Sequence, residues 1–516
     1  MSPTYGVVAV VLVSVATLAI GAYGWQFSRT TSDFFVASRS VRPALNASAI
    51  GGEYLSAASF LGVAGLVLAF GADMLWYPVG WTAGYFVLLV LVAAPLRRSG
   101  AYTLSDFAES RLESAMVRKV SALLVVAVGW LYLMPQFDGA GLSLSTIADT
   151  PPWAGGVLVA TVVLVNVLFG GMRSITFVQA FQYWLKLTAL LVPVMFLLAV
   201  WVGDGATSPA TTAVAGVAGA DWADPTVSDG YGLYTTYSLI VATFLGTMGL
   251  PHVVVRFYTN PDGNAARRTT LVVLALLGIF YVLPPVYGAL GRIYTPDLVA
   301  AGQSDTVVLE LPGRMVEGIA GTLLSSLTAA GAFAAFLSTS SGLTIAVAGV
   351  LSQDVLGRSA WGRRLGGVRT FQIGAAVAVT LPLLLTLLTQ GVGVARAVGL
   401  AFAFAASTFC PLIVLGIWWR RLTAAGAVAG MLVGGLLCGG AVLDSLLGRT
   451  HEGWLGTLLA QPAAWTVPAA FLTMVVGSLL TRSRVPAHVG TYMVRLHTPE
   501  SVALDRGRVV PGALDR

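Results

Sequence analysis

The stretch Asn46-Ala-Ser-Ala-Ile-Gly-Gly-Glu-Tyr-Leu-Ser-Ala-Ala-Ser59 interrupts an apolar segment with a glycine pair, an acidic residue and several hydroxyl groups. A second segment, Thr243-Phe-Leu-Gly-Thr-Met-Gly-Leu-Pro-His252, is interrupted in the same way by two glycines and a proline. In a membrane, an interrupted helix is tolerated only where its freed backbone groups are buried in protein or line a cavity. Both segments are therefore expected to be broken membrane-spanning helices that contribute to a site near the bilayer midplane.

The composition of the whole chain is that of an integral membrane protein. Of its 516 residues, 56% are hydrophobic and only 10% are charged, and the mean hydropathy is +0.82. Soluble proteins carry about 25% charged residues, so a soluble chain is excluded. A membrane-spanning helix needs about 20 apolar residues, and thirteen runs in this chain are long enough. These runs begin near Tyr5, Leu45, Leu75, Ala122, Trp153, Leu185, Tyr234, Thr270, Met315, Phe371, Ala395, Ala424 and Trp465.

The basic residues predict how these spans are oriented. The first run, Tyr5–Trp25, has no basic residue before it and is followed by three arginines between residues 29 and 42. We therefore expect an uncleaved span with its N-terminus outside, and thirteen spans then place the C-terminus inside. In that topology 25 of the 29 basic residues, Lys186 and Arg256 among them, fall in cytoplasmic loops or in the tail. The pI of about 9.4 thus reflects membrane orientation, and no nucleic-acid partner is expected.

The predicted domain organisation is one transmembrane domain over residues 1–484 and a polar cytoplasmic tail over residues 485–516. Residues 203–231 are rich in Ala, Gly, Thr and Asp, and are expected to form a solvated external loop. Both cysteines, Cys410 and Cys438, lie within apolar runs, which excludes a disulfide framework or a zinc site.

Two acidic residues and a cluster of hydroxyl groups lie within predicted spans. A carboxylate at mid-membrane costs at least ~2.5 kcal/mol, so Glu53 is expected to have a function. Asp138 in the fourth span is the second such acid, although it could instead face water near the outer mouth. The ninth span carries four consecutive hydroxyl residues, Ser338–Ser341, of which at least one must face the bundle interior. Hydroxyl and carbonyl oxygens are the ligands that a small hard cation prefers.

From about residue 33 to residue 484, these and further segments make the chain similar to a known family. It resembles the sodium:solute symporter family, most closely the bacterial acetate and monocarboxylate branch. The segments that carry the resemblance are Asp33–Arg39, Gly52–Gly62, Gly170–Ser174, Gly249–Val253, Ser338-Thr339 with Asp354, Ala405–Ser407 and Gly416–Arg420. The resemblance implies an all-α fold with thirteen or more spans, an external N-terminus and a leucine-transporter-like core. That core consists of two inverted five-helix repeats, here spans two to six and seven to eleven.

The resemblance also implies a sodium site between the second and ninth spans. Its ligands would be the backbone carbonyls of Gly52, Leu55 and Ala335 and the hydroxyls of Ser338 and Thr339. These five oxygens carry no formal charge, which suits a cation that is released in every cycle. No cofactor is expected besides this co-transported cation.

One position departs from the pattern of many sugar and proline transporters of the family. After the glycine pair these relatives carry a Thr-Asp sequence, whereas the segment Thr176–Gln182 places a neutral Gln179 there. A fixed carboxylate within ~6 Å of an anionic substrate would repel it or become protonated. The departure favours an anionic substrate, argues against sugars and makes a second sodium site doubtful.

The expected function is uptake of a short monocarboxylate, such as acetate, propionate or pyruvate, driven by sodium or proton entry. The substrate carboxylate is expected to meet half-helix N-termini near Gly52 and Gly246, whose free N–H groups attract anions. Either Glu53 or Asp138 could carry a second cation as a proton. The expected substrate contacts are Glu53, Tyr54, Gln136, Asp138, Gln179, Gln182 and Thr247.

Two alternatives stay open. The chain could be a sodium symporter for another small solute, such as proline or pantothenate, or a non-transporting membrane sensor of the same fold. An enzyme is not expected, because the chain has no nucleophile–base pair, metal cluster or phosphate loop, and His252 is interpreted as a polar cap at a helix break. The expected partners are a small monocarboxylate, a monovalent cation and the lipid bilayer of the cell membrane.

Overall fold

The computed structural model describes residues 3–25, 41–212, 214, 219–225, 231–388, 393–449, 451–500 and 502. The Asp33–Arg39 motif, parts of the predicted external loop and the last residues of the tail lie outside this part of the chain.

All regular elements of the described residues are helices. The first half of the chain forms α1 (Pro3–Trp25), α3 (Pro43–Tyr54), η2 (Ala58–Gly62), α4 (Val63–Phe70), η3 (Ala72–Leu75), α5 (Trp76–Val87), η4 (Leu88–Val92), α6 (Ala93–Ser99), α7 (Leu104–Leu112), α8 (Ala115–Ala148), α9 (Pro152–Gly203), η5 (Pro209–Thr211) and α10 (Gly219–Ala223). The second half forms α11 (Gly232–Gly249), α12 (Pro251–Tyr258), α13 (Gly263–Tyr281), α14 (Leu283–Tyr294), α15 (Asp297–Ala300), η6 (Ser304–Thr306), α16 (Val307–Met315), α17 (Gly318–Val350), η7 (Leu351–Leu356), α18 (Ala360–Leu365), α19 (Gly367–Leu388), α20 (Val394–Trp418), α21 (Ala424–Leu446), α22 (Gly453–Ala460), α23 (Ala463–Leu480), η8 (Arg482–Arg484) and α24 (Val489–His497).

The number of spans agrees with the sequence-based prediction. Within the described residues, eleven helices are long and apolar enough to cross a membrane, and the bent pair α3 and η2–α4 makes a twelfth. Helix α9 has 52 residues, which at 1.5 Å per residue is about 78 Å, far beyond a hydrocarbon core of about 30 Å. It is divided at Gly171, whose positive φ of 59° suits glycine alone. Its two halves are the predicted fifth and sixth spans, which brings the number to thirteen.

The two predicted helix breaks are present, but the glycines are not where the helices end. Helix α3 continues through the glycine pair, and the chain then bends by 71° before η2 and α4. Helix α11 continues past Gly246, and extended Leu250 separates it from α12. The expectation of half-helix N-termini near Gly52 and Gly246 is therefore wrong, because these termini lie at Ala58 and Pro251.

The glycines instead allow the helices to approach closely. A Cβ atom on Gly52 would lie 2.1 Å from the backbone oxygen of Gln179 on α9. A Cβ atom on Gly246 would lie 2.4 Å from the backbone oxygen of Phe402 on α20. Each glycine therefore brings one face of a broken span against a neighbouring helix.

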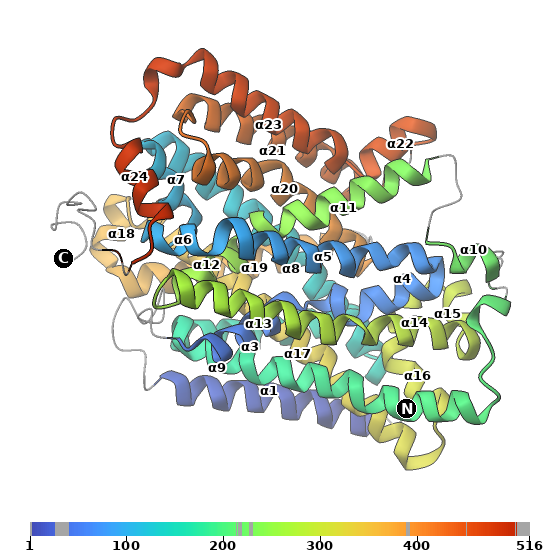
Figure 1. The fold of residues 1–516 in the computed structure, drawn as a ribbon. Helices are drawn as coiled ribbons and strands as arrows, with labels where there is room; N and C mark the ends of the chain where they lie inside the picture. The colour runs from blue at the N-terminus through green and yellow to red at the C-terminus, as the bar shows by residue number, and fades with distance from the viewer. Residues whose placement is uncertain are drawn as a thin grey trace.

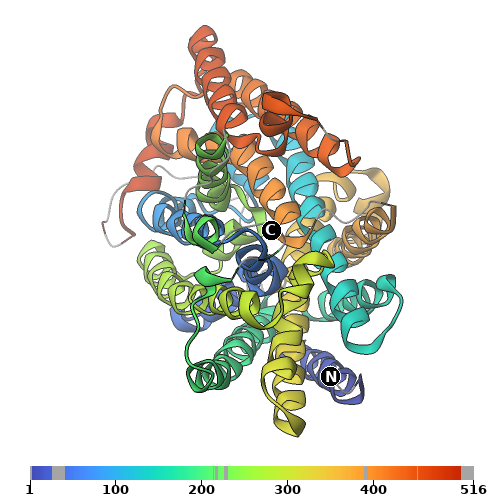
Figure 2. The same cartoon turned by 90° about the vertical axis from the view of Figure 1, so that its right-hand side faces the viewer.

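Helix α17 lies at the centre of the bundle. In the most apolar 18-residue stretch of each span, 94% of the residues of α17 are buried, but only 33% of those of α1, α19 and α23. Helices α9, α8, α1 and α3 pack against α17. Figure 2, viewed along the spans, shows α21 and α23 on the flank opposite α1, and Figure 1 agrees. The broken α3 thus meets the most buried helix of the molecule.

The N-terminus of α1 and helix α24 lie at opposite ends of the bundle. The N-terminus of α1 lies at the end that carries α10, α15 and α22, whereas α7, α18 and α24 lie at the other end (Figure 1). This arrangement is compatible with the predicted external N-terminus and cytoplasmic C-terminus. The predicted tail contains a packed element, because α24 contacts α6 and buries Tyr492, Met493 and Leu496.

Candidate functional site

A buried ion pair joins the two broken spans. The Nε atom of Arg256 on α12 lies 2.6 Å from the Oε2 atom of Glu53 on α3. The same guanidinium donates to the hydroxyl of Thr176, at 2.9 Å, and to the side-chain oxygen of Gln179 on α9. All four residues are buried. Glu53 therefore lies inside the bundle as predicted, but its charge is neutralised by a partner that the sequence alone did not reveal.

A lysine lies among the oxygens that the sequence predicts to bind sodium. The Nζ atom of Lys186 on α9 donates to the carbonyls of Gly52 and Leu55, at 2.5 and 2.6 Å, and to the hydroxyl of Ser338, at 2.9 Å. The Ser338 hydroxyl also donates to the carbonyl of Ala335, at 3.1 Å. Lys186 is fully buried and joins the break after α3 to the middle of α17.

Thr339, the fifth predicted sodium ligand, forms a further hydrogen bond between α17 and α3. The hydroxyl of Thr339 donates to the backbone oxygen of Glu53, at 2.7 Å. Gln179 connects to the same place, since its Nε2 atom donates to the backbone oxygen of Ser338, at 2.8 Å. The structure therefore brings all five predicted ligands together, and their role as sodium ligands stays a prediction.

Next to this polar cluster, aromatic side chains pack together and form an apolar surface that also carries hydroxyl and ring nitrogen atoms. We call Tyr54, Trp81, Tyr85, Tyr132, His252 and Phe402 the aromatic cluster. The hydroxyl of Tyr54 lies 2.9 Å from the hydroxyl of Thr247 on α11. The ring of Tyr54 packs edge-on against that of Tyr85, with centroids 4.6 Å apart, and Phe402 contacts Tyr54, Trp81 and Tyr132.

Several polar atoms of the aromatic cluster are available for a ligand. The Nε1 atom of Trp81, the hydroxyl of Tyr85 and both ring nitrogens of His252 are buried and have no hydrogen-bond partner among the described residues. A buried donor without a partner is costly to a protein. A small ligand with an apolar part and a polar group would satisfy these atoms while it packs against the rings.

The sequence profile described as "SSF: Sodium:solute symporter family" matches residues 34–434. The chain belongs to the sodium:solute symporter family. This symporter is 32% identical over 506 residues to the "Monocarboxylic acid transporter" of Corynebacterium glutamicum, an alignment that covers 92% of this chain and 90% of the relative. It is 30% identical over 505 residues to the "Uncharacterized symporter YwcA" of Bacillus subtilis, which covers 92% and 96%.

Solved structures support the fold of the symporter. A Na+-coupled sialic acid symporter in a substrate-bound outward-open state matches with a TM-score of 0.67 at 15% identity, covering 92% of this chain and 98% of that one. Mhp1, a nucleobase-cation-symport-1 family transporter in a closed conformation, matches with a TM-score of 0.58 at 14% identity, covering 90% and 99%. The predicted transporter fold and the multi-pass location in the cell membrane are thus confirmed.

The remaining predicted substrate contacts of the symporter have different surroundings. Gln136 accepts a hydrogen bond from the backbone N–H of Ala57, at 3.1 Å, and so caps the helix after the first break. Gln182 donates to the hydroxyl of Thr17 on α1, at 3.0 Å. Asp138 lines a cavity of about 540 Å³ at the end of the bundle that carries α15. Gln136 is thus hydrogen-bonded to a broken span.

Two basic residues of the buried cluster in the symporter were assigned to cytoplasmic loops by the topology prediction. Lys186 lies inside α9 and Arg256 inside α12, and 1% or less of each residue is exposed. That assignment is wrong, because both cations have partners inside the bundle. A sequence signal for Lys186 existed, since it follows Leu185 at the very start of an apolar run, and the chain has only one other lysine, Lys119.

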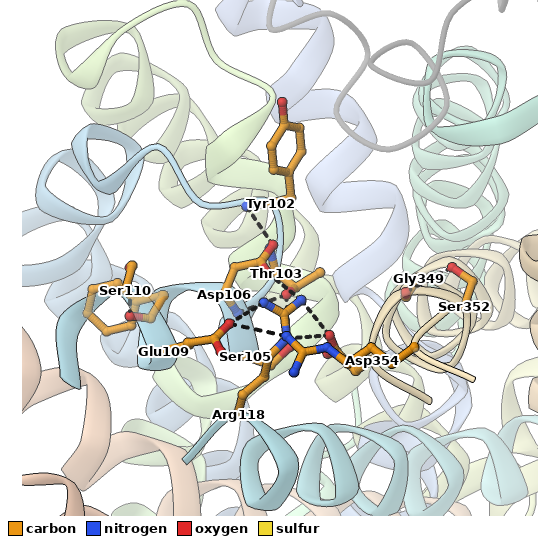
Figure 3. A network of polar contacts seen from close by, with 12 residues as sticks. Tyr102, Thr103, Ser105, Asp106, Glu109, Ser110, Arg118, Gly349, Ser352 and Asp354 are labelled. Carbon is orange, nitrogen blue, oxygen red and sulfur yellow. Dashed lines mark hydrogen bonds and ion pairs between the residues drawn. The ribbon is translucent and has the colours of Figure 1, made fainter. Parts of the chain in front are cut away.

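At the end of the bundle that carries α7, a second ionic network holds the helices together (Figure 3). The guanidinium of Arg118 lies 2.7 Å from Asp106, 2.5 Å from Glu109 and 2.5 Å from Asp354. The hydroxyl of Ser105 donates to Asp354, at 2.6 Å. This network fixes η7, which continues α17, against α7 and α8 of the symporter.

Proposed function

We propose that the chain is a secondary symporter that couples the entry of a cation, sodium or a proton, to the uptake of a short monocarboxylate such as acetate, propionate or pyruvate. The observation that carries this proposal is the set of ionisable groups in the buried cluster, two basic and one acidic. Lys186 and Arg256 contribute two positive charges and Glu53 one negative charge, so the ionised cluster has a net charge of one positive. A buried net charge favours a ligand of opposite sign.

The neighbouring groups suit a small carboxylate. Gln179, at the position where many relatives have an acid, is neutral and adds no second carboxylate to that of Glu53, which is paired with Arg256. Trp81 and Tyr85 offer an N–H and an O–H donor, and the ring of Phe402 offers an apolar surface for a short hydrocarbon chain. The similarity to the monocarboxylic acid transporter of Corynebacterium glutamicum supports the same substrate class.

The two broken spans would bring the cation and the substrate together. The five oxygens of Gly52, Leu55, Ala335, Ser338 and Thr339 lie where α3 meets α17, and Glu53 connects α3 to α12. Movement of α3 against α17 would therefore alter both sites at once. Such coupling is what alternating access requires of a symporter.

A competition experiment tests the substrate class. The purified protein is reconstituted into liposomes, and uptake of radiolabelled pyruvate is measured with inward proton and sodium gradients together. We expect acetate and propionate to compete with pyruvate, and proline, pantothenate and glucose not to compete. Competition by proline or pantothenate but not by acetate would instead identify a symporter for another solute. Protein-free liposomes correct for passive diffusion of the undissociated acid.

The donors of the aromatic cluster provide a second test of the same proposal. The Tyr85→Phe variant keeps the ring and removes the hydroxyl, which has no hydrogen-bond partner in the described part of the chain. We expect it to raise the KM for pyruvate while its unfolding temperature stays close to that of the wild type. An unchanged KM would mean that the carboxylate binds elsewhere.

A further inference from the structure

Four exposed arginines from two separate connections lie close together at one end of the bundle. Two of them lie between α20 and α21, and the other two begin and end η8, directly after α23. The hydroxyls of Thr423 and Thr481 lie 2.7 Å apart and join the two connections. Each arginine is within three residues of one of these threonines, a stretch that spans at most about 11 Å. We call these four residues the arginine patch: Arg420, Arg421, Arg482 and Arg484.

The packing of α21 against α23 holds the two connections next to each other. The backbone N–H of Thr423 donates to the hydroxyl of Ser478, at 3.2 Å, and both residues are buried. A Cβ atom on Gly477 would lie 3.1 Å from the Cα atom of Gly426, so the backbones of the two helices approach closely at this end. The two pairs of arginines are therefore held side by side by buried contacts of the fold.

The guanidinium groups of the arginine patch are not used within the described part of the chain. Their side chains have neither an ion pair nor a hydrogen-bond partner there. The end of α20 is capped by Arg111 instead, which donates to the carbonyls of Gly416 and Trp419, at 2.8 and 3.0 Å. An uncompensated concentration of positive charge attracts an anion. Five acidic residues at the same end have basic partners of their own: Asp106, Glu109, Glu113, Asp354 and Glu500.

An apolar face of α23 leads directly to the arginine patch. Leu472, Val476 and Leu480 are 66%, 43% and 81% exposed, and their spacing of four residues places them on one face of the helix. At 1.5 Å per residue, this face extends over about 12 Å. Trp418, which is 47% exposed, lies two residues before Arg420, and exposed tryptophans are typical of the level of the lipid headgroups. The surface therefore presents positive charge at the headgroup level and apolar side chains towards the bilayer interior.

We propose that the arginine patch binds the headgroup of an anionic phospholipid, and that an acyl chain of this lipid packs along the exposed face of α23. Guanidinium groups bind phosphate oxygens with paired N–H donors. About four basic residues directly beside a membrane-spanning helix are typical of a site for anionic lipid. A soluble phosphate compound would match the charge of the patch but not the apolar face.

The bound lipid would connect the end of α23 to the start of α21. Its headgroup would contact arginines of both connections, and these connections belong to the flank of the bundle opposite α1 (Figure 2). Binding should therefore stabilise the packing of α21 against α23. Because this flank lies apart from the broken spans, the inference is independent of the proposed transport function.

The test uses the full-length protein in non-ionic detergent. Native mass spectrometry counts the lipids that the protein retains while dioleoylphosphatidylglycerol is added, and dioleoylphosphatidylcholine is the neutral comparison. Unfolding temperatures are recorded with each lipid and with inorganic phosphate. The patch variant combines Arg420→Gln, Arg421→Gln, Arg482→Gln and Arg484→Gln. The control variant loses the same charge from exposed arginines of the same end that have no partner among the described residues, by Arg267→Gln, Arg268→Gln, Arg364→Gln and Arg369→Gln.

We expect the wild type and the control variant to retain one phosphatidylglycerol more tightly than any that follow. The patch variant should bind this lipid at least about tenfold more weakly, since each basic residue near an anionic surface contributes about fivefold. Phosphatidylglycerol should raise the unfolding temperature of the wild type and of the control variant, whereas phosphatidylcholine and inorganic phosphate should not. The comparison of the two lipids on the wild type is decisive even if the patch variant does not fold.

Five results would overturn the proposal. Equal retention by the patch variant and the wild type would place the lipid elsewhere, and an equal loss in the control variant would mean that net charge alone attracts it. Phosphatidylcholine retained as tightly as phosphatidylglycerol would exclude recognition of charge. Stabilisation by inorganic phosphate would identify a site for a free anion. A wild type that forms dimers and retains no lipid would identify the flank as a contact between two copies of the chain.

Discussion

Arg256 and Glu53 form an ion pair that is buried away from water, and the charge of each residue compensates that of the other. Breaking a buried pair by neutralising one partner typically costs 3–5 kcal/mol, because a buried charge is left uncompensated. We expect Glu53→Gln to lower the free energy of unfolding by about this amount. The measurement is a denaturation series with Glu53→Gln, Arg256→Gln and the double variant. The double variant should lose less than the sum of the two single losses, and strict additivity would contradict the pairing.

Gly342 on α17 provides a test of how tightly the same carboxylate is held. A Cβ atom there would lie 2.0 Å from the Oε1 atom of Glu53, whereas a Cβ atom on Gly278 of α13 would meet nothing within 4 Å. We expect Gly342→Ala to lower the unfolding temperature and to reduce pyruvate uptake. Gly278→Ala is the matched control and should be neutral or stabilising by up to about 1 kcal/mol, because alanine favours a helix. Equal effects of the two substitutions would argue against a fixed Glu53 side chain.

At the scale of elements, Asp354 holds η7 to Arg118 of α8 and to Ser105 of α7. Hydrogen bonds to charged groups are worth about 1.5–3 kcal/mol when buried, and the Asp354 side chain is only 3% exposed. We expect Asp354→Asn to lower the free energy of unfolding by about that much. Arg358→Gln is the control, since this exposed residue reaches Glu109 only at 3.5 Å. A control variant as unstable as Asp354→Asn would refute a specific role for Asp354.

Asp305 in η6 lies at the opposite end of the bundle, and we expect its titration to make the stability of the protein depend on pH. Burial raises the pKa of Asp305 to about 6, and the charge of Asp138 adds to this rise, while a hydrogen bond from the Val394 N–H opposes it. An acid with a raised pKa favours this conformation when protonated, so its contribution is present below about pH 4 and is lost as the pH rises through about 6. We expect the unfolding temperature of the wild type to fall between pH 4 and pH 7 more than that of Asp305→Asn. Parallel curves would contradict this.

The broken spans illustrate what the sequence could predict about an element. Glycines and a proline within two apolar segments were enough to predict two discontinuous helices, and Pro251 does begin α12. The exact break in the second span was not predictable from the glycine pair. A glycine inside a helix can serve either flexibility or close packing, and the choice depends on Gln179, more than a hundred residues away.

For the whole molecule, the number of spans followed from apolar length, which is counted along the chain, and the orientation predicted from the basic residues stays a prediction. Counting residues along the chain could not identify the partners of Lys186, because its acceptors Gly52, Leu55 and Ser338 lie 131 to 152 residues from it in sequence. The resemblance did indicate those three oxygens as cation ligands. The resemblance could not indicate that the Lys186 ammonium lies among these oxygens, because its position depends on the packing of α9 against α3 and α17.

The central claim is that a short monocarboxylate and a cation, sodium or a proton, enter together. It is tested most directly by the uptake of radiolabelled pyruvate into proteoliposomes under an inward gradient of either cation, with the membrane potential clamped at zero. We expect one of the two gradients to drive the accumulation of pyruvate above its external concentration, and neither gradient to drive the accumulation of proline. Proteoliposomes that accumulate no pyruvate under either gradient would contradict the account.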